Sequence, residues 1–312
     1  MPEPQPSFER RPDPTSPLYV PAVDLGGFML RDTMAIEVRE REMNDFDTVQ
    51  RILGSGIDTV ETIEHLTVTN YSPMIQLMVR RRFSPELWAM QDRWTRDEWN
   101  HAQAVGTVAR QLGKPSLIET GQVRADMHPH KKALFAAAGM LTLVSPSAAS
   151  KITCTIAFGG AINEIQGGWD YATKEEQLRS AKEFDLADLY AQLHPHEATH
   201  AGGYKRIFRR HWDKLTERGK RHVLWMGPGH FDMVGEPQVG AYRLGELLVA
   251  GGHDIKEIIT TLDEHGSRLT NRPKESPLSF AEKALLACAR SYKEDYELGQ
   301  TAEQQGLDPL VA

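Results

Sequence analysis

Apolar residues recur at helical spacing through most of this chain. In the segment from about 45 to 69, they fall three to five positions apart, at Val49, Ile52, Ile57, Val60 and Ile63. Gly54 and Gly56 lie within that run and lower helix stability, so a break or kink is expected there. A polar stretch from Ala35 to Arg41 is predicted to be helical as well.

Three further long helices are predicted. The first spans 84–112, beginning at Ser84-Pro85 and ending before Gly113. The others span about 147–171 and 174–215, and the latter contains Pro195, which should bend it. Shorter helices are predicted at 133–144, 238–250, 254–265 and 279–298, with a loop at 227–230. No stretch of any length has the period of a strand, so an all-α fold is expected.

The first 34 residues are rich in proline and are predicted to form an extended, poorly ordered arm, leaving 35–312 as one domain. The chain begins with neither a basic segment nor an apolar run, and its longest apolar stretch, Ala133 to Val144, is too short to cross a bilayer. Cys154 and Cys288 lie in apolar stretches, as expected of buried thiols in a reducing compartment. The net charge of -7 argues against nucleic-acid binding. A soluble, cytoplasmic protein without membrane contact is expected.

Two Glu-x-x-His tetrapeptides carry the candidate chemistry. They run from Glu98 to His101 and from Glu197 to His200. Residues three apart share one face of a helix, so each tetrapeptide can present a carboxylate and an imidazole to one metal ion. One such motif is expected by chance in a chain with 12 histidines. The surrounding spacing is therefore needed to decide its meaning.

Each tetrapeptide is preceded at a similar distance by another glutamate. Glu64 lies 34 positions before Glu98, and Glu164 lies 33 positions before Glu197. Two helices that each give one Glu and two that each give Glu-x-x-His form the ligand set of a carboxylate-bridged di-iron or di-manganese centre. Glu164 also follows an almost uncharged helical stretch, where an unpaired carboxylate would be costly. Glycines at 159, 160, 167 and 168 leave room for a ligand or for close helix contact.

The residues around these motifs resemble a known family. Trp94-Thr95-Arg96-Asp97-Glu98-Trp99-Asn100-His101, His196-Glu197-Ala198-Thr199-His200 and Gly229-His230-Phe231-Asp232-Met233 are similar to segments of soluble acyl-[acyl-carrier-protein] desaturases. The similarity covers roughly residues 45 to 265. It implies a ferritin-like four-helix bundle with a di-metal core plus additional helices. It also implies catalytic iron ligands at Glu64, Glu98, His101, Glu164, Glu197 and His200.

The resemblance has three departures. The segment around Glu64 lacks the family's usual sequence motif, so Glu61 is an alternative first ligand. Gly167 stands where family members have a threonine near the oxygen-binding position. His196 stands where they have an aspartate. The metal site is therefore predicted more firmly than the desaturation chemistry.

The function that follows from the resemblance is a di-iron oxidoreductase that uses O2 as co-substrate to oxidise an unactivated C–H bond. Two Fe ions are expected, with manganese at one position as an alternative. The implied partners are a ferredoxin or reductase, an acyl carrier protein or a small acyl or amine substrate, and a second copy of the chain. Basic clusters at Arg80–Arg82 and at Lys205, Arg206, Arg209 and Arg210 could receive an acidic carrier. The alternatives are an N-oxygenase or hydroxylase and a non-catalytic iron-binding bundle.

Overall fold

The structure is a computed structural model that describes residues 12–54, 56–121, 129–224 and 251–271. Within these ranges the chain is mostly helical, and its strands are short segments of two residues each. The predicted all-α fold is therefore confirmed. None of the described helices is long and apolar enough to cross a membrane. The helices predicted at 238–250 and 279–298, and the loop at 227–230, lie outside the described residues.

The first predicted helix is divided into several elements. Helix α1 (Phe46–Leu53) ends at Gly54, and α2 (Ile57–Leu66) begins after Gly56, so the break expected at these glycines is confirmed. A π-helical turn, η2 (Thr67–Tyr71), then leads directly into α3 (Ser72–Met78). Single π-helical turns within helices are frequent at functional sites. This one begins three residues after Glu64.

The three long helices are α4 (Pro85–Gln111), α6 (Pro146–Ser180) and α7 (Phe184–Trp212). The predicted start of the last helix at 174 is wrong, because residues 174–180 continue α6. The chain reverses only at Lys182, whose φ of 66° places it in the left-handed region. The carboxylate of Glu183 accepts the backbone N–H groups of Asn44 and Asp45, which fixes this turn against the N-terminal segment.

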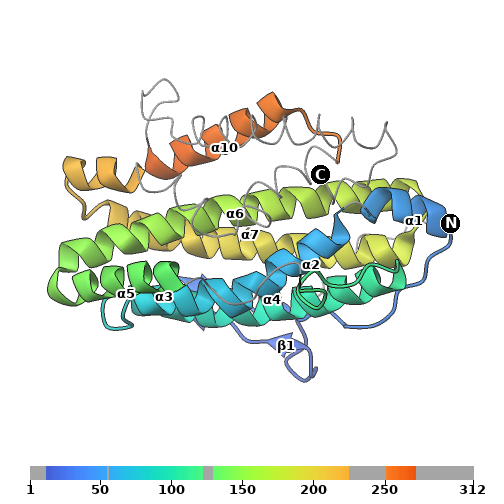
Figure 1. Cartoon of the computed structure of the whole chain (residues 1–312), viewed down its shortest axis with the longest axis horizontal. Coiled ribbons are helices and arrows are strands. Elements are labelled where there is room, and N and C mark those ends of the chain that lie inside the picture. The colour runs from blue at the N-terminus through green and yellow to red at the C-terminus, as the bar shows by residue number, and fades with distance from the viewer. Residues whose placement is uncertain (1–11, 55, 122–128, 225–250, 272–312) are drawn as a thin grey trace.

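The long helices pack in pairs (Figure 1). Helices α6 and α7 run side by side along most of their length, α2 packs on α4, and α4 also contacts α7. Helix α5 (Pro129–Val144) covers α3 and one end of α6. Helix α10 (Ile255–Thr270), longer than the predicted 254–265, packs on α6 and α7 at the side away from α4. Helices α2, α4, α6 and α7 are thus brought together.

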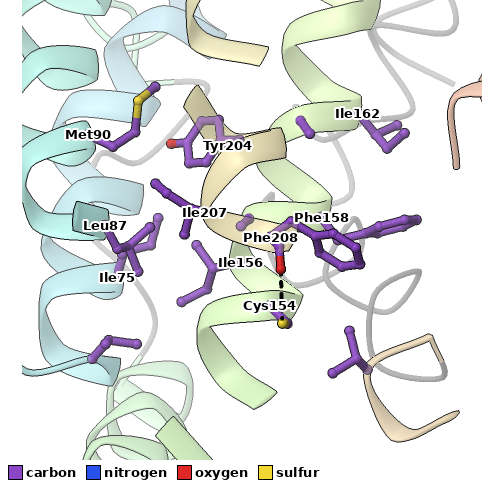
Figure 2. Packing of buried hydrophobic residues seen from close by; sticks show 14 of the residues in the cluster. Ile75, Leu87, Met90, Cys154, Ile156, Phe158, Ile162, Tyr204, Ile207 and Phe208 are labelled. Carbon is purple, nitrogen blue, oxygen red and sulfur yellow. Dashed lines mark hydrogen bonds between the residues drawn. The ribbon is translucent and has the colours of Figure 1, made fainter. Parts of the chain in front are cut away.

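Two apolar clusters fill the space between these helices. One contains Leu66, Trp94, Ile162 and Tyr204 among others, and part of it is drawn in Figure 2, where the Cys154 thiol points at the carbonyl oxygen of Phe208. The other contains Val60, Val105, Tyr171 and Leu193. On each of the four helices, one member lies before and one lies after the candidate ligands. The charged layer is therefore enclosed by apolar packing at both ends.

The N-terminal arm is ordered where the structure describes it, contrary to the prediction. Strand β1 (Tyr19–Val20) pairs with β4 (Thr33–Met34), and β2 (Val23–Asp24) pairs with β3 (Met29–Leu30). Val20, Leu25 and Leu30 are buried. Leu25 and Leu30 belong to the main apolar cluster of the bundle, and this packing holds the segment in place. The proline-rich composition alone gave no sign of that packing. Residues 1–11 lie outside the described part.

The predicted helix at 35–41 is also wrong, because this segment runs extended along α4. The side chain of Asn100 accepts the N–H of Ile36 at 2.6 Å and donates to its carbonyl at 2.9 Å. Gln111 does the same for Arg41, at 2.9 and 3.0 Å. These two amides on α4 satisfy the backbone groups that a helix would otherwise satisfy internally.

Candidate metal centre

Four helices bring the six predicted ligands into one buried layer. Helix α2 contributes one glutamate and α6 another, whereas α4 and α7 each contribute one Glu-x-x-His pair. Every one of these side chains is at most 6% exposed. The residues are Glu64, Glu98, His101, Glu164, Glu197 and His200.

The six side chains form two overlapping groups of four. One group is Glu64, Glu98, His101 and Glu197, and the other is Glu98, Glu164, Glu197 and His200. Within each group, one potential ligand atom from every residue lies within 4.8 Å of all the others. Glu98 and Glu197 belong to both groups, as carboxylates that bridge two ions would. Glu64 and Glu164 belong to one group each, as terminal ligands would.

Both imidazoles turn Nδ1 toward the carboxylates. His101 Nδ1 lies 3.3 Å from Glu197 Oε1 and 3.6 Å from Glu98 Oε2. His200 Nδ1 lies 3.0 Å from Glu164 Oε2 and 3.1 Å from Glu98 Oε1. Each histidine therefore offers one nitrogen to the centre and keeps Nε2 for an outer partner.

Several polar atoms of this layer are buried without a hydrogen bond to the described residues. They are Glu64 Oε2, Glu98 Oε1, Glu197 Oε1 and His101 Nδ1. A buried polar atom with no partner is costly. Three of these atoms lie together, because His101 Nδ1 is 3.3 Å from Glu197 Oε1 and 3.9 Å from Glu64 Oε2. Carboxylate oxygens with imidazole nitrogens suit divalent iron or manganese. The residues present therefore fit a pair of such ions.

Protons would compete strongly with metal ions for these carboxylates. Burial raises the pKa of Glu64 and of Glu164 well above the usual value, and neighbouring carboxylates reinforce that rise. Burial lowers the pKa of His101, but Glu98 and Glu197 outweigh it and raise that pKa to about 9. Without a cation, the layer thus holds extra protons, and a bound metal ion would have to displace them.

An aromatic donor holds the second oxygen of each terminal carboxylate. The hydroxyl of Tyr171 donates to Glu64 Oε1, and the indole N–H of Trp94 donates to Glu164 Oε1 at 3.1 Å. In each glutamate this leaves Oε2 for the centre. Neither donor role was predicted. Tyr171 lies two helical turns after Glu164, which is the signal that could have indicated it.

The residue that precedes each motif glutamate reaches across to the histidine of the other motif. Asp97 Oδ2 lies 2.9 Å from His200 Nε2, and His196 Nδ1 lies 2.9 Å from His101 Nε2. Asp97 also accepts a hydrogen bond from Arg93 Nε at 2.6 Å. The sequence prediction treated His196 as a departure from the family and missed both pairings, which depend on the contact between α4 and α7.

Glu61, the alternative first ligand, lies outside both groups. Its Oε1 is 3.5 Å from Arg110 Nη1 and 3.7 Å from His65 Nε2. A Cβ added at Gly106 of α4 would come within 2.5 Å of the same oxygen. Gly106 therefore makes room for Glu61 to turn toward α4, and Glu64 is the member of α2 that enters the layer.

The glycines of α6 serve two purposes. A Cβ added at Gly160 would lie 2.8 Å from the ring of Tyr204, so this glycine allows close contact with α7. A Cβ at Gly167 would lie 3.4 Å from Glu197 Oε2. No side chain at position 167 therefore stands between α6 and that carboxylate.

Two other parts of the motif segments are not among the described residues of the layer. Trp99 is 48% exposed and packs edge-on against His65, so it is not a core residue. The Gly229–Met233 segment lies outside the described residues. No family model, curated protein or solved structure matches the chain.

Proposed function

We propose that this protein is a di-iron, oxygen-dependent oxidoreductase that resembles acyl-[acyl-carrier-protein] desaturases and adopts their ferritin-like bundle. The observation that carries the proposal is the pair of buried four-residue groups that share Glu98 and Glu197. Two terminal carboxylates, two shared carboxylates and one imidazole for each ion make up the donor set of a di-iron centre. Manganese at one position is the alternative metal content.

Two irons held by these residues and reduced by a ferredoxin or reductase would supply electrons to O2, so that O2 can oxidise a C–H bond of the substrate. The protein residues orient and protect that centre. Tyr171 and Trp94 hold one oxygen of each terminal carboxylate, so that the other oxygen faces the metal position. The apolar clusters on both sides exclude water, which strengthens electrostatic interactions within the layer.

An acyl group on a carrier protein is the proposed substrate. Acyl carrier proteins are acidic, and Lys205, Arg209 and Arg268 gather on neighbouring faces of α7 and α10. Burial lowers the pKa of Lys205, and the positive charges of Arg209 and Arg268 lower it further, as expected where like charges crowd. Arg206 and Arg210 are less available, because Arg206 stacks over Phe28 and Arg210 bonds the carbonyl of Gly26.

A second candidate, an N-oxygenase or hydroxylase, is favoured by Gly167. The family's threonine at this position is absent, and the Glu197 carboxylate lacks a covering side chain from position 167. Such an enzyme would add an oxygen atom to a small amine or acyl substrate. A non-catalytic iron-binding bundle has no comparable supporting observation among the described residues.

The test begins with metal content. Metal-depleted protein would be loaded with Fe2+ without oxygen, and iron per chain would be measured after desalting, with Glu98→Ala as the control. Two irons in the wild type and almost none in the variant are expected. Equal iron in both proteins would contradict the proposed site.

The second stage identifies the reaction. Loaded protein would receive a reductant, O2 and acyl chains on a carrier protein or on a small thioester, and mass spectrometry would follow the product. Loss of two hydrogen atoms supports desaturation, whereas gain of one oxygen atom supports the second candidate. Arg209→Glu with Arg268→Glu should raise KM for the carrier-bound substrate alone. Iron binding without oxygen-dependent product from either kind of substrate would favour the non-catalytic bundle.

A further inference from the structure

The two metal positions have the same kinds of ligand but different outer partners. Each position has two shared carboxylates, one terminal carboxylate and one imidazole. The terminal carboxylates have equivalent outer partners, since each accepts one hydrogen bond from a neutral aromatic donor. The difference lies behind the histidines, where His200 meets a carboxylate and His101 meets another imidazole.

The partner of His200 is a carboxylate fixed by several contacts. Arg93 is fully buried and donates to Asp97 Oδ2, to the carbonyl of Pro21 at 3.0 Å and to the hydroxyl of Thr33 at 2.5 Å. The N-terminal ladder, meaning the two short strand pairs within residues 19–34, thereby fixes the position of Arg93, and Arg93 fixes Asp97. The carboxylate is held 2.9 Å from His200 Nε2, where it can accept the N–H of that ring.

The partner of His101 is the imidazole of His196, which can accept a hydrogen bond only in its neutral form. When Nδ1 of His101 binds a metal ion, its Nε2 keeps the proton and must donate it. The atom 2.9 Å away is Nδ1 of His196, which can accept that hydrogen bond only as an unprotonated nitrogen. The two rings also stack, with centroids 5.2 Å apart and planes 27° apart. The environment of this histidine therefore contains a ring nitrogen where the other contains a carboxylate oxygen.

A carboxylate that accepts from a metal-bound histidine makes the ring a stronger ligand and fixes its orientation. A neutral nitrogen makes this contribution more weakly, because hydrogen bonds to charged acceptors are about twice as strong. Loss of such an outer partner typically reduces metal affinity by about 10–100-fold. The same range is the expected difference between the two positions.

We infer that Asp97 and His196 are positioning residues that make the two metal positions unequal, so that the ion beside His200 binds first and more tightly. This inference rests on the proposed di-metal function. It also gives His196 a role that the family resemblance left open. An ion at the His101 position would be the one that exchanges more readily, which would allow a different metal there.

Stepwise Co2+ binding tests this inference, because it requires no catalytic activity. Metal-depleted protein would be titrated while calorimetry records each binding step and visible absorption records the coordination of each ion. Two steps that differ by about 10–100-fold in affinity are expected for the wild type. His196→Asp should tighten the weaker step alone, and Asp97→Asn should weaken the tighter step alone.

His196→Gln is the matched control, since its amide oxygen is a neutral acceptor. This variant should leave the difference in affinity between the two steps nearly unchanged. This variant also separates the effect of charge from that of side-chain packing. If Gln and Asp changed the difference in affinity between the two steps equally, the proposed role of charge would be overturned. Two equal steps in the wild type would overturn the inference while leaving the metal site intact. No Co2+ bound by the wild type would overturn both the inference and the proposed function.

Discussion

The two halves of the candidate metal centre look alike in sequence and differ in their surroundings. Both halves use a glutamate followed 33 or 34 positions later by Glu-x-x-His. The His200 half is supported by Asp97, Arg93 and the N-terminal ladder, whereas the His101 half is supported by a second imidazole. A repeated ligand motif therefore does not imply two equivalent metal positions. The packing behind the ligands can distinguish them.

The largest expected effect comes from the residues that both halves share. Glu98→Ala or Glu197→Ala should remove both ions, because each carboxylate contributes to both four-residue groups. Glu64→Ala or Glu164→Ala should remove only one ion. Metal analysis after desalting measures this difference, and circular dichroism checks that the helices persist. If Glu98→Ala retained one full ion, that carboxylate would not be shared.

Removing one imidazole at a time separates the halves. His200→Ala should leave one ion of weak affinity, whereas His101→Ala should leave one ion of high affinity, and the two remaining affinities should differ by about 10–100-fold. Equilibrium dialysis against Co2+ provides both values. Equal residual affinities would show that the outer partners do not matter, even if each variant lost one ion.

The pH dependence of stability should depend on whether metal is bound. In the metal-free protein, the pKa of His101 rises from 6.5 to about 9, so its protonation stabilises the fold fully below pH 6.5 and is lost as pH rises through 9. The difference corresponds to about 3 kcal/mol of unfolding free energy. The raised pKa values of Glu64 and Glu164 act in the same direction.

Urea unfolding of the metal-free protein at pH 6.5 and pH 9 tests this expectation. His101→Gln is the control and should show a smaller loss of stability over the same range. Metal-loaded protein should not lose stability in this way, because bound ions replace the protons. A metal-free protein that becomes more stable toward pH 9 would contradict the protonated state described for the layer.

The sequence predicted the three long helices and named all six residues of the layer, but it placed the boundary between α6 and α7 about ten residues too early. Helical spacing and capping signals predicted α4 nearly to the residue, and the repeated spacing brought Glu64 and Glu164 into the prediction. These features are local or periodic. They can be read without knowing which helices touch.

The parts that sequence did not predict depend on contacts between distant segments. The ladder at 19–34 and the extended run at 35–41 are held by side chains of α4, including Asn100 and Arg93. The pairing of Asp97 with His200, 103 positions apart, requires α4 and α7 to be neighbours. Composition alone favoured disorder for the first of these segments because it contains no information about such partners.

The smallest effects should come from removing the aromatic donors, each of which contacts the terminal carboxylate of one metal position. Tyr171→Phe removes one hydrogen bond to Glu64 and keeps the ring, so the ion beside His101 should bind about 10-fold more weakly, as expected for about 1.5 kcal/mol at a charged acceptor. Trp94→Phe removes the bond to Glu164 and should weaken the ion beside His200 by a similar factor. Stepwise Co2+ titration assigns each loss to a step. If Tyr171→Phe weakened the tighter step instead, the order of binding inferred for the two halves would be reversed.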